Sequence, residues 1–273
     1  MEYKSCIHTH TQFCDGKSSM ADFCKRAAQL GYRSIGFTPH SPLPYESDWA
    51  MKKEDLIAYL EEIRYLKGYY EEELDVLCGV EWDSETPEPF IEAEYVIGSV
   101  HSFSKKGVHF SVDYAKEELE RVIFELYDGS FLALCADYFE ELAKHAVKKQ
   151  VDLVGHFDLP TKYNADGTFV NERDPAYLKL ALKTADEILA ARPEMFFEIN
   201  TGVMARAGKR DPYPSEQILA HLAKRGARFV ITGDCHKAEH LSVGYDRALE
   251  LVQKHCRGRL YMLTLSGFER VEL

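Results

Sequence analysis

Short apolar runs alternate with amphipathic segments along almost all of the 273 residues. Eight of these runs have the length and the apolar content of buried strands. They are residues 5–7, 34–38, 75–81, 95–101, 152–156, 195–200, 228–234 and 260–265. Strands that alternate with helices pair in parallel, and a parallel sheet of this size can close on itself. The alternation therefore predicts an α/β fold, a distorted, TIM-like (β/α) barrel.

The segments between the strands carry helix signals. Apolar residues recur at helical spacing in residues 20–30, 52–70, 137–149, 176–191 and 215–226. Ser19 and Asp22 have the spacing of a capping box before the first of these helices, and Gly31 ends it. Residues 82–94 carry no helix signal, so the barrel is expected to be irregular there. No linker or repeat interrupts the series, which predicts a single domain over residues 1–273.

Polar residues of the kinds that bind metals follow six of the predicted strands. Catalytic residues of such barrels lie at the carboxyl ends of the strands, so these side chains are expected to meet at one face. The candidate metal ligands are His8, His10, Asp15, His40, Glu81, His101, His156, Asp234 and His236. The other five histidines, at positions 109, 145, 221, 240 and 255, have no such placement. Each candidate alone could be a capping or salt-bridging residue, but their joint placement favours a metal centre.

The size and chemistry of the ligand set indicate which ions it would bind. A catalytic zinc-type ion takes about three or four protein ligands, so this set suits two or three divalent ions, with Glu81 able to bridge. Mixed imidazole and carboxylate ligands favour Zn, Mn or Fe. Cys235 points away from its neighbours Asp234 and His236 in an extended chain, so it is interpreted as a packing residue.

The net charge and the cysteine content indicate which cell compartment and which partners fit this sequence. The formal net charge of −12 argues against a nucleic-acid surface, although bound metal ions could still attract a phosphorylated metabolite. The seven cysteines occur singly, which is typical of a reducing cytoplasm. The sequence contains no signal peptide and no apolar run of membrane length, so no membrane association is expected. It does not indicate an oligomeric state.

The motifs, taken in order, are similar to those of a known family. HTHTQFCDG, TPH, GVE, GSVH, VGHFDL and GDCH resemble the motifs of the polymerase and histidinol phosphatase (PHP) family over nearly the whole chain. The resemblance implies a distorted (β/α)7 barrel with a trinuclear metal centre. It places one ion on His8, His10, Glu81 and Asp234, a second on Glu81, His101 and His156, and a third on Asp15, His40 and His236.

Three longer stretches resemble the histidinol-phosphate phosphatase branch of that family. They are GSVHSFSKKGVHFSVD, VGHFDLPTKYN and EINTGV with the later YPSEQIL. The resemblance implies hydrolysis of L-histidinol phosphate to L-histidinol and phosphate by a hydroxide that bridges two metal ions. In this branch, basic residues in the loops after the fifth and sixth strands hold the phosphate.

Metal clusters of this kind suit phosphate ester hydrolysis, and the sequence has no signature of a serine or cysteine nucleophile. The expected catalytic residues are Glu81, His101 and Asp234, the last of which could protonate the leaving group in place of a metal-bound water. Arg206, Lys162 and Ser102 are the candidate phosphate contacts.

Three alternatives remain at this stage. They are a PHP phosphoesterase with another phosphomonoester or phosphodiester substrate, an amidohydrolase-type metal hydrolase, and a barrel with a vestigial site. An amidohydrolase would normally supply a bridging lysine where this chain has Glu81.

Overall fold

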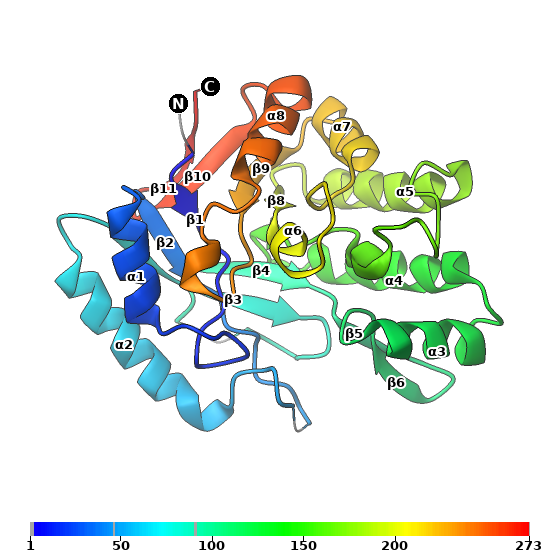
Figure 1. The fold of residues 1–273 in the computed structure, drawn as a ribbon, viewed down its shortest axis with the longest axis horizontal. Coiled ribbons are helices and arrows are strands. Elements are labelled where there is room, and N and C mark those ends of the chain that lie inside the picture. Colours follow the sequence, from blue (N-terminus) through cyan, green and yellow to red (C-terminus); the bar gives the residue numbers. More distant parts are fainter. Residues whose placement is uncertain (1–2, 46, 90–91, 273) are drawn as a thin grey trace.

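Seven parallel strands form the centre of the molecule (Figure 1). The structure is a computed structural model that describes residues 3–45, 47–89 and 92–272. In sheet order the strands are β1 (Ser5–Cys6), β2 (Ser34–Phe37), β3 (Asp75–Asp83), β4 (Tyr95–Ser99), β7 (Leu153–Val154), β8 (Phe196–Asn200) and β9 (Arg228–Thr232). The sheet curls until the chain after β9 meets the chain after β1, where a parallel bridge joins Thr9 and Cys235. The distorted seven-stranded barrel is thus confirmed.

Helices surround the barrel. They are α1 (Met20–Gln29), α2 (Leu56–Tyr69), α3 (Lys116–Leu126), α4 (Phe131–Ala146), α5 (Pro175–Ala191), α6 (Gly202–Arg206), α7 (Glu216–Lys224) and α8 (Tyr245–His255). The short 3₁₀ helices are η1 (Lys53–Asp55), η2 (Leu159–Tyr163) and η3 (Ala238–His240). Figure 1 shows α1 and α2 on one side of the sheet and α4 and α5 on the other. None of the described helices is long and apolar enough to cross a membrane.

The start of α1 shows how local sequence determines an element. The Ser19 side chain accepts a hydrogen bond from the backbone of Asp22, and the Asp22 carboxylate accepts one from the backbone of Ser19. This reciprocal arrangement satisfies two amides that lack a partner within the helix. Gly31 follows the helix with φ +67°, a conformation that glycine adopts without strain. The predicted capping box and stop are both confirmed.

The barrel interior is packed around Tyr95. This ring is buried, and its hydroxyl donates a hydrogen bond of 2.7 Å to the backbone oxygen of Ile7 in the opposite wall. A Cβ atom at Gly36 would lie 2.0 Å from that hydroxyl. A glycine in the middle of β2 therefore makes room for an aromatic ring that joins two sides of the barrel.

The eighth predicted strand does not enter the ring. β10 (Leu260–Thr264) pairs in parallel with the first part of β9 and then turns back as β11 (Gly267–Arg270). Tyr3 donates a hydrogen bond to the backbone oxygen of Tyr261, so the start of the chain lies against β10. β9 meets the chain that follows β1 only beyond its own end, through the bridge between Thr9 and Cys235.

Several elements were not predicted. They are α3, α6, α8, β11 and the hairpin of β5 (Ser102–Lys105) and β6 (Val108–Ser111). The sequences of α3 and α8 do carry helical spacing of buried residues, so their signal was available. The hairpin turn uses Lys106 and Gly107, both with positive φ, in place of the commoner Asn-Gly pair. The described residues between β3 and β4 contain no helix, as expected.

Candidate metal centre

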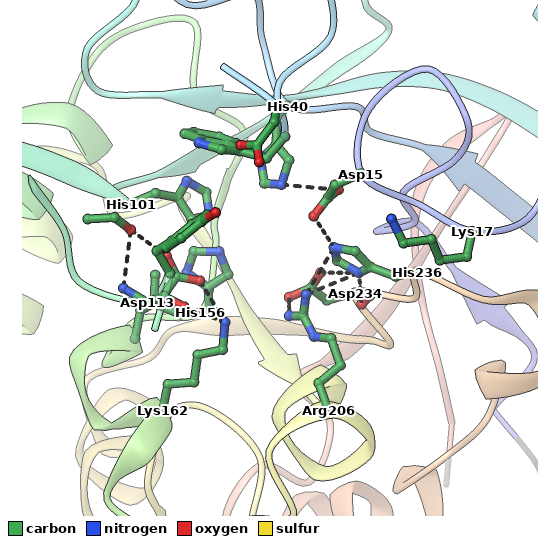
Figure 2. A pocket seen from close by; sticks show the side chains of 15 residues that line it. Asp15, Lys17, His40, His101, Asp113, His156, Lys162, Arg206, Asp234 and His236 are labelled. Atoms are coloured by element: carbon green, nitrogen blue, oxygen red, sulfur yellow. Dashed lines mark hydrogen bonds and ion pairs between the residues drawn. The ribbon is translucent and has the colours of Figure 1, made fainter. Parts of the chain in front are cut away.

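The nine side chains predicted from the strand ends lie together at the carboxyl face of the barrel. Figure 2 shows six of them, Asp15, His40, His101, His156, Asp234 and His236. Six of the seven ring strands, or the loops that follow them, supply them, and β8 supplies none. The other five histidines lie in the β5–β6 hairpin, α4, α7, η3 and α8. The placement expected from the alternation of strands and helices is therefore the one found.

Glu81 lies at the centre of the cluster. Its Oε1 is 2.8 Å from Nε2 of His156 and 3.4 Å from Nε2 of His101, and it accepts a hydrogen bond of 2.7 Å from Ser99. Complete burial alone would raise the pKa of Glu81, but the imidazoles around it, His101 and His8 foremost, hold that pKa well below its usual range. The carboxylate is therefore ionised, as a bridging ligand must be.

The second oxygen of Glu81 faces three other imidazoles. Oε2 lies 2.9 Å from Nδ1 of His40 and 3.4 Å from Nε2 of both His8 and His10. Although Oε2 and Nδ1 of His40 are close, they do not form a hydrogen bond with each other. In the described structure neither this Oε2 nor Nδ1 of His40 has a hydrogen-bond partner. Buried polar atoms without a partner are costly, and a shared cation would satisfy both of these.

His8 and His10 direct their Nε2 atoms to one point. These two nitrogens are 3.1 Å apart. Two ligands of a tetrahedral zinc ion, each at roughly 2.0–2.1 Å from it, would be about 3.3 Å apart, so the pair fits a single ion. Burial lowers the pKa of His10 to about 3, and the neighbouring His236 and His40 act in the same direction. A neutral imidazole is the form that binds metal.

The loop after β1 carries Asp15 back to the cluster. Asp15 Oδ2 lies 3.0 Å from Nε2 of His236, while Oδ1 lies 3.6 Å from Nδ1 of His10 and 3.7 Å from Nε2 of His40. This path requires Gly16, because a Cβ there would lie 2.1 Å from the backbone oxygen of His10. Asp15 thus joins a group of side chains different from the one formed by His8 and Glu81.

Asp234 completes the cluster from the end of β9. Its Oδ1 is 3.3 Å from Nε2 of His10, and its Oδ2 accepts a hydrogen bond of 2.5 Å from Arg206. Burial opposes ionisation, but Arg206 and His8 hold the pKa of Asp234 well below its usual range. Asp234 also has φ +44°, a left-handed conformation that is unfavourable for a residue with a side chain. Such local strain is typical of functional sites.

Three groups of ligand atoms are compact enough to hold an ion. They are His8, His10 and Glu81; His40, Glu81 and His101; and His10, Asp15, His40 and His236. These groups overlap the three ligand sets implied by the family resemblance but differ from them in part. His40 and His10 each belong to two groups, and the predicted ligands His156 and Asp234 belong to none of the three. Glu81 belongs to two of the groups, which fits a bridging carboxylate. The donor set, nitrogen and carboxylate oxygen, suits Zn, Mn or Fe.

Sequence reasoning missed two buried carboxylates that hydrogen-bond to candidate ligands. Glu198 in β8 accepts a hydrogen bond of 2.5 Å from Nδ1 of His8, and Asp83 in β3 accepts one of 3.0 Å from Nδ1 of His101. A signal did exist for both. Asp83 follows Glu81 by two residues and so faces the same side of β3, and Glu198 is an acidic residue among the apolar residues Phe196, Phe197 and Ile199 of β8.

A cavity of about 300 Å³ opens above the cluster. Arg206 and Lys162, two of the three predicted phosphate contacts, line it together with His101, His156 and Asp234 (Figure 2). Arg206 also donates to the ring of His236. Phosphoryl oxygens could bind between these cations and the cluster.

Of the other predicted residues, Ser102 and Cys235 do not line this cavity, whereas Lys162 lines it and is held in place by a carboxylate. Lys162 is held by Asp113, which accepts hydrogen bonds from its ammonium through the backbone oxygen (2.7 Å) and Oδ2 (3.0 Å). Ser102, the third predicted phosphate contact, is buried in β5 and is not among the residues that line the cavity. Cys235 is buried, in keeping with a packing residue.

Comparison with known proteins assigns this arrangement to a family. The PHP domain matches residues 7–202, which is more than half of the chain. The chain belongs to the PHP domain family. The amidohydrolase alternative is thereby set aside. Asp234 and His236 lie beyond the matched residues, although they share the cluster with His8 and His10 in the structure.

Relatives of this PHP protein match it over most of their length. It is 29% identical over 261 residues to a "Probable histidinol-phosphatase" of Deinococcus radiodurans, covering 90% of this chain and 91% of that one. It is 24% identical over 269 residues to the histidinol-phosphatase of Bacillus subtilis, covering 89% and 97%.

Solved structures share the fold. A candidate histidinol phosphatase, HisK, of Listeria monocytogenes matches with a TM-score of 0.76 and 19% identity over 89% of this chain and 99% of that one. The histidinol phosphate phosphatase of Lactococcus lactis, solved with zinc, L-histidinol and phosphate, matches with a TM-score of 0.65 and 20% identity over 98% of this chain and 100% of that one.

Proposed function

We propose that this protein is a metal-dependent phosphomonoesterase that hydrolyses L-histidinol phosphate to L-histidinol and phosphate in histidine biosynthesis. The observation that carries the proposal is the convergence of nine imidazole and carboxylate side chains below a cavity lined by Arg206 and Lys162. The relatives that match nearly the whole chain carry the name histidinol-phosphatase, and the Lactococcus lactis enzyme was solved with zinc and both products.

We assign the nine clustered side chains as ligands of two or three divalent ions of the Zn, Mn or Fe type. When bound, such ions lower the pKa of water and neutralise charge on a phosphoryl group. A P–O bond to water forms, the P–O bond to the alcohol breaks, and one proton passes from the water to the leaving oxygen.

The chain's own residues have distinct roles in this proposal. Arg206 and Lys162 bind and orient the phosphoryl oxygens. Asp234 remains ionised because Arg206 and His8 lower its pKa, so its carboxylate can accept a hydrogen bond from the water and orient the proton that passes to the leaving oxygen. Glu81 and His101 hold the ions, and Ser102, which does not line the cavity, is given no role.

The proposal extends to the domain and the compartment. Residues 1–273 form one PHP-type metallohydrolase domain, since β9 lies beyond the family match and still completes the ring. A cytoplasmic location is supported by the seven cysteines, all of which are free, and by the biosynthetic role that the relatives' name implies.

Phosphate release tests the proposal. Zinc- or manganese-loaded protein would be assayed with L-histidinol phosphate, an aryl phosphate and a phosphodiester, with the His101→Asn variant as a control for contaminating phosphatases. We expect a strong preference for L-histidinol phosphate. Hydrolysis of only the other esters would retain the metal centre and reject the substrate. No hydrolysis of any of the three, with metals bound, would contradict the phosphoesterase assignment.

A further inference from the structure

Glu198 is a buried carboxylate within the barrel that the proposed reaction does not use. It lies in β8, the one ring strand that supplies none of the nine candidate ligands, and only 1% of its surface is exposed. A buried carboxylate is costly unless hydrogen bonds satisfy both oxygens. Both oxygens of Glu198 accept hydrogen bonds, and the donors are candidate metal ligands or a residue next to one.

Glu198 contacts His8 directly. Its Oε1 lies 2.5 Å from Nδ1 of His8. A carboxylate can only accept, so Nδ1 of His8 carries the proton. The free lone pair of this imidazole is then on Nε2, the nitrogen that lies 3.1 Å from Nε2 of His10 and 3.4 Å from Glu81. One hydrogen bond thus determines both the tautomer and the direction of a ligand.

The other oxygen of Glu198 supports two further ligands. Oε2 accepts a hydrogen bond of 2.9 Å from the backbone N–H of His156 and one of 3.0 Å from the side-chain amide of Asn200. The same amide lies 3.4 Å from Oδ2 of Asp234. A single side chain in β8 is therefore connected to ligands that follow β1, β7 and β9.

Asp83 repeats this pattern on another side of the cluster. Its Oδ2 accepts hydrogen bonds from both Nδ1 (3.0 Å) and the backbone N–H (3.1 Å) of His101. Carboxylates that hold the second nitrogen of a ligating histidine raise its basicity and fix its orientation. The two carboxylates thus orient different imidazoles toward Glu81.

We propose that Glu198 is a positioning residue of the metal centre, which directs Nε2 of His8 toward the ion that it shares with His10 and thereby sets the affinity for that ion. This inference rests on the proposed metal centre. It extends that proposal to a strand without ligands and predicts which of the bound ions is most sensitive to Glu198.

The test compares zinc binding by wild-type protein and by the Glu198→Gln variant. Glutamine preserves the shape of the side chain and removes its charge. We expect one zinc ion to bind about 10- to 100-fold more weakly, while the other ions remain bound and the metal-free variant unfolds at the wild-type temperature. Excess zinc should then restore turnover, which it would not do for a purely structural defect.

Two further variants make the comparison specific. Glu94→Gln is the matched control, because Glu94 also accepts a backbone hydrogen bond, from Cys78, at the other end of the barrel. It should leave zinc binding unchanged. Asp83→Asn should lower the affinity for a zinc ion other than the one affected by Glu198→Gln. Equal zinc affinity in Glu198→Gln and wild type would overturn the inference, whereas failure of wild type itself to bind zinc would overturn the proposed metal centre.

A measurement on the wild type covers the case in which Glu198→Gln does not fold. Nitrogen NMR of histidine-labelled, zinc-loaded protein reports which ring nitrogen of His8 carries a proton. A protonated Nδ1 with zinc on Nε2 supports the proposed role. A protonated Nε2 would contradict it.

Discussion

At the scale of one residue, Glu81 shows why the candidate metal centre requires so many neighbours. Each oxygen of this buried carboxylate faces imidazole nitrogens, and those imidazoles come from several strands. A buried carboxylate without them would be neutral at physiological pH. The surrounding imidazoles keep it ionised, so the binding capacity of Glu81 depends on the whole cluster.

His101 offers the most direct test of a single ligand. We expect His101→Asn to lower kcat by at least about 100-fold, because a ligand contributes more than the outer contacts for which losses of about 10- to 100-fold are typical. The melting temperature should change little by comparison. Steady-state kinetics and thermal unfolding measure both effects.

The matched control for this variant is His109→Asn, in the β5–β6 hairpin outside the cluster. It should retain wild-type kcat. A His101→Asn enzyme with near-normal kcat would remove His101 from the catalytic centre.

The burial of His145 predicts that the stability of the fold depends on pH. This histidine is buried in α4, where its Nε2 lies 2.8 Å from the backbone oxygen of Trp82, and burial lowers its pKa from 6.5 to about 4. Below about pH 6.5 the unfolded chain takes up a proton that the folded protein does not. The free energy of unfolding should therefore fall as the pH drops from 6.5 towards 4, by an amount on the order of 2–3 kcal/mol.

Denaturant unfolding of wild type and His145→Gln between pH 4 and 7.5 measures this slope. The glutamine variant should show a shallower dependence, since its amide can donate to Trp82 without titrating. His221→Gln, at a partly exposed site in α7, is the control. Identical pH profiles for wild type and His145→Gln would disprove the assignment.

The sequence was most informative about residues that can bind a metal and that also follow a predicted strand. His8, His10 and the other clustered histidines follow strands directly, so strand prediction was enough to place them. Glu198 and Asp83 support the cluster from within strands, where an acidic residue in a sequence gives no indication of its partner. Their role depends on hydrogen bonds to residues 190 and 18 positions away, which only the fold reveals.

At the scale of elements, the loop after β1 brings Asp15 into the cluster by a narrow path. We expect Gly16→Ala to displace this loop, because the new Cβ would overlap the backbone of His10. The variant should lose the ion that Asp15 helps to hold and become less stable. Metal analysis after dialysis and denaturant unfolding measure the two effects.

Gly68→Ala in α2 is the matched control for the loop variant. A Cβ at Gly68 would meet nothing within 4 Å, and alanine favours a helix by up to about 1 kcal/mol over glycine. This control should be as stable as wild type or slightly more so, with full metal content. Full metal content in Gly16→Ala would show that the loop tolerates the extra atom.

Element prediction succeeded where burial and periodicity agreed and failed where tertiary contacts decided. The eight strand candidates all form strands, and the capping box of α1 is present. The exclusion of β10 from the ring depends on its pairing with β11 and on the contact of Tyr3 with Tyr261. Neither feature is encoded in the periodicity of any one segment.

For the whole molecule, metal removal should lower stability. The candidate ligands extend from six of the seven ring strands or their following loops, so bound ions would link most of the barrel. An ion present at about a thousand times its Kd contributes roughly 4 kcal/mol, which corresponds to a shift in melting temperature of roughly 10 °C for a chain of this size.

Thermal unfolding before and after chelation, followed by re-addition of zinc, measures this contribution. We expect a reversible fall in melting temperature. An unchanged melting temperature in protein shown to have lost its ions would argue that the cluster contributes nothing to folding and would support a vestigial site.

The bridge that closes the barrel has a further consequence. Thr9 lies between His8 and His10, and its partner Cys235 lies between Asp234 and His236, so candidate ligands flank both sides of the seam. The backbone amides of His10 and Cys235 donate hydrogen bonds across it. Ions held there would connect the two sides of this seam. After their loss, these two amides should exchange with deuterium earlier than the backbone amides in the rest of the ring. The barrel would then open first at the mouth of the cavity, where the substrate is proposed to bind.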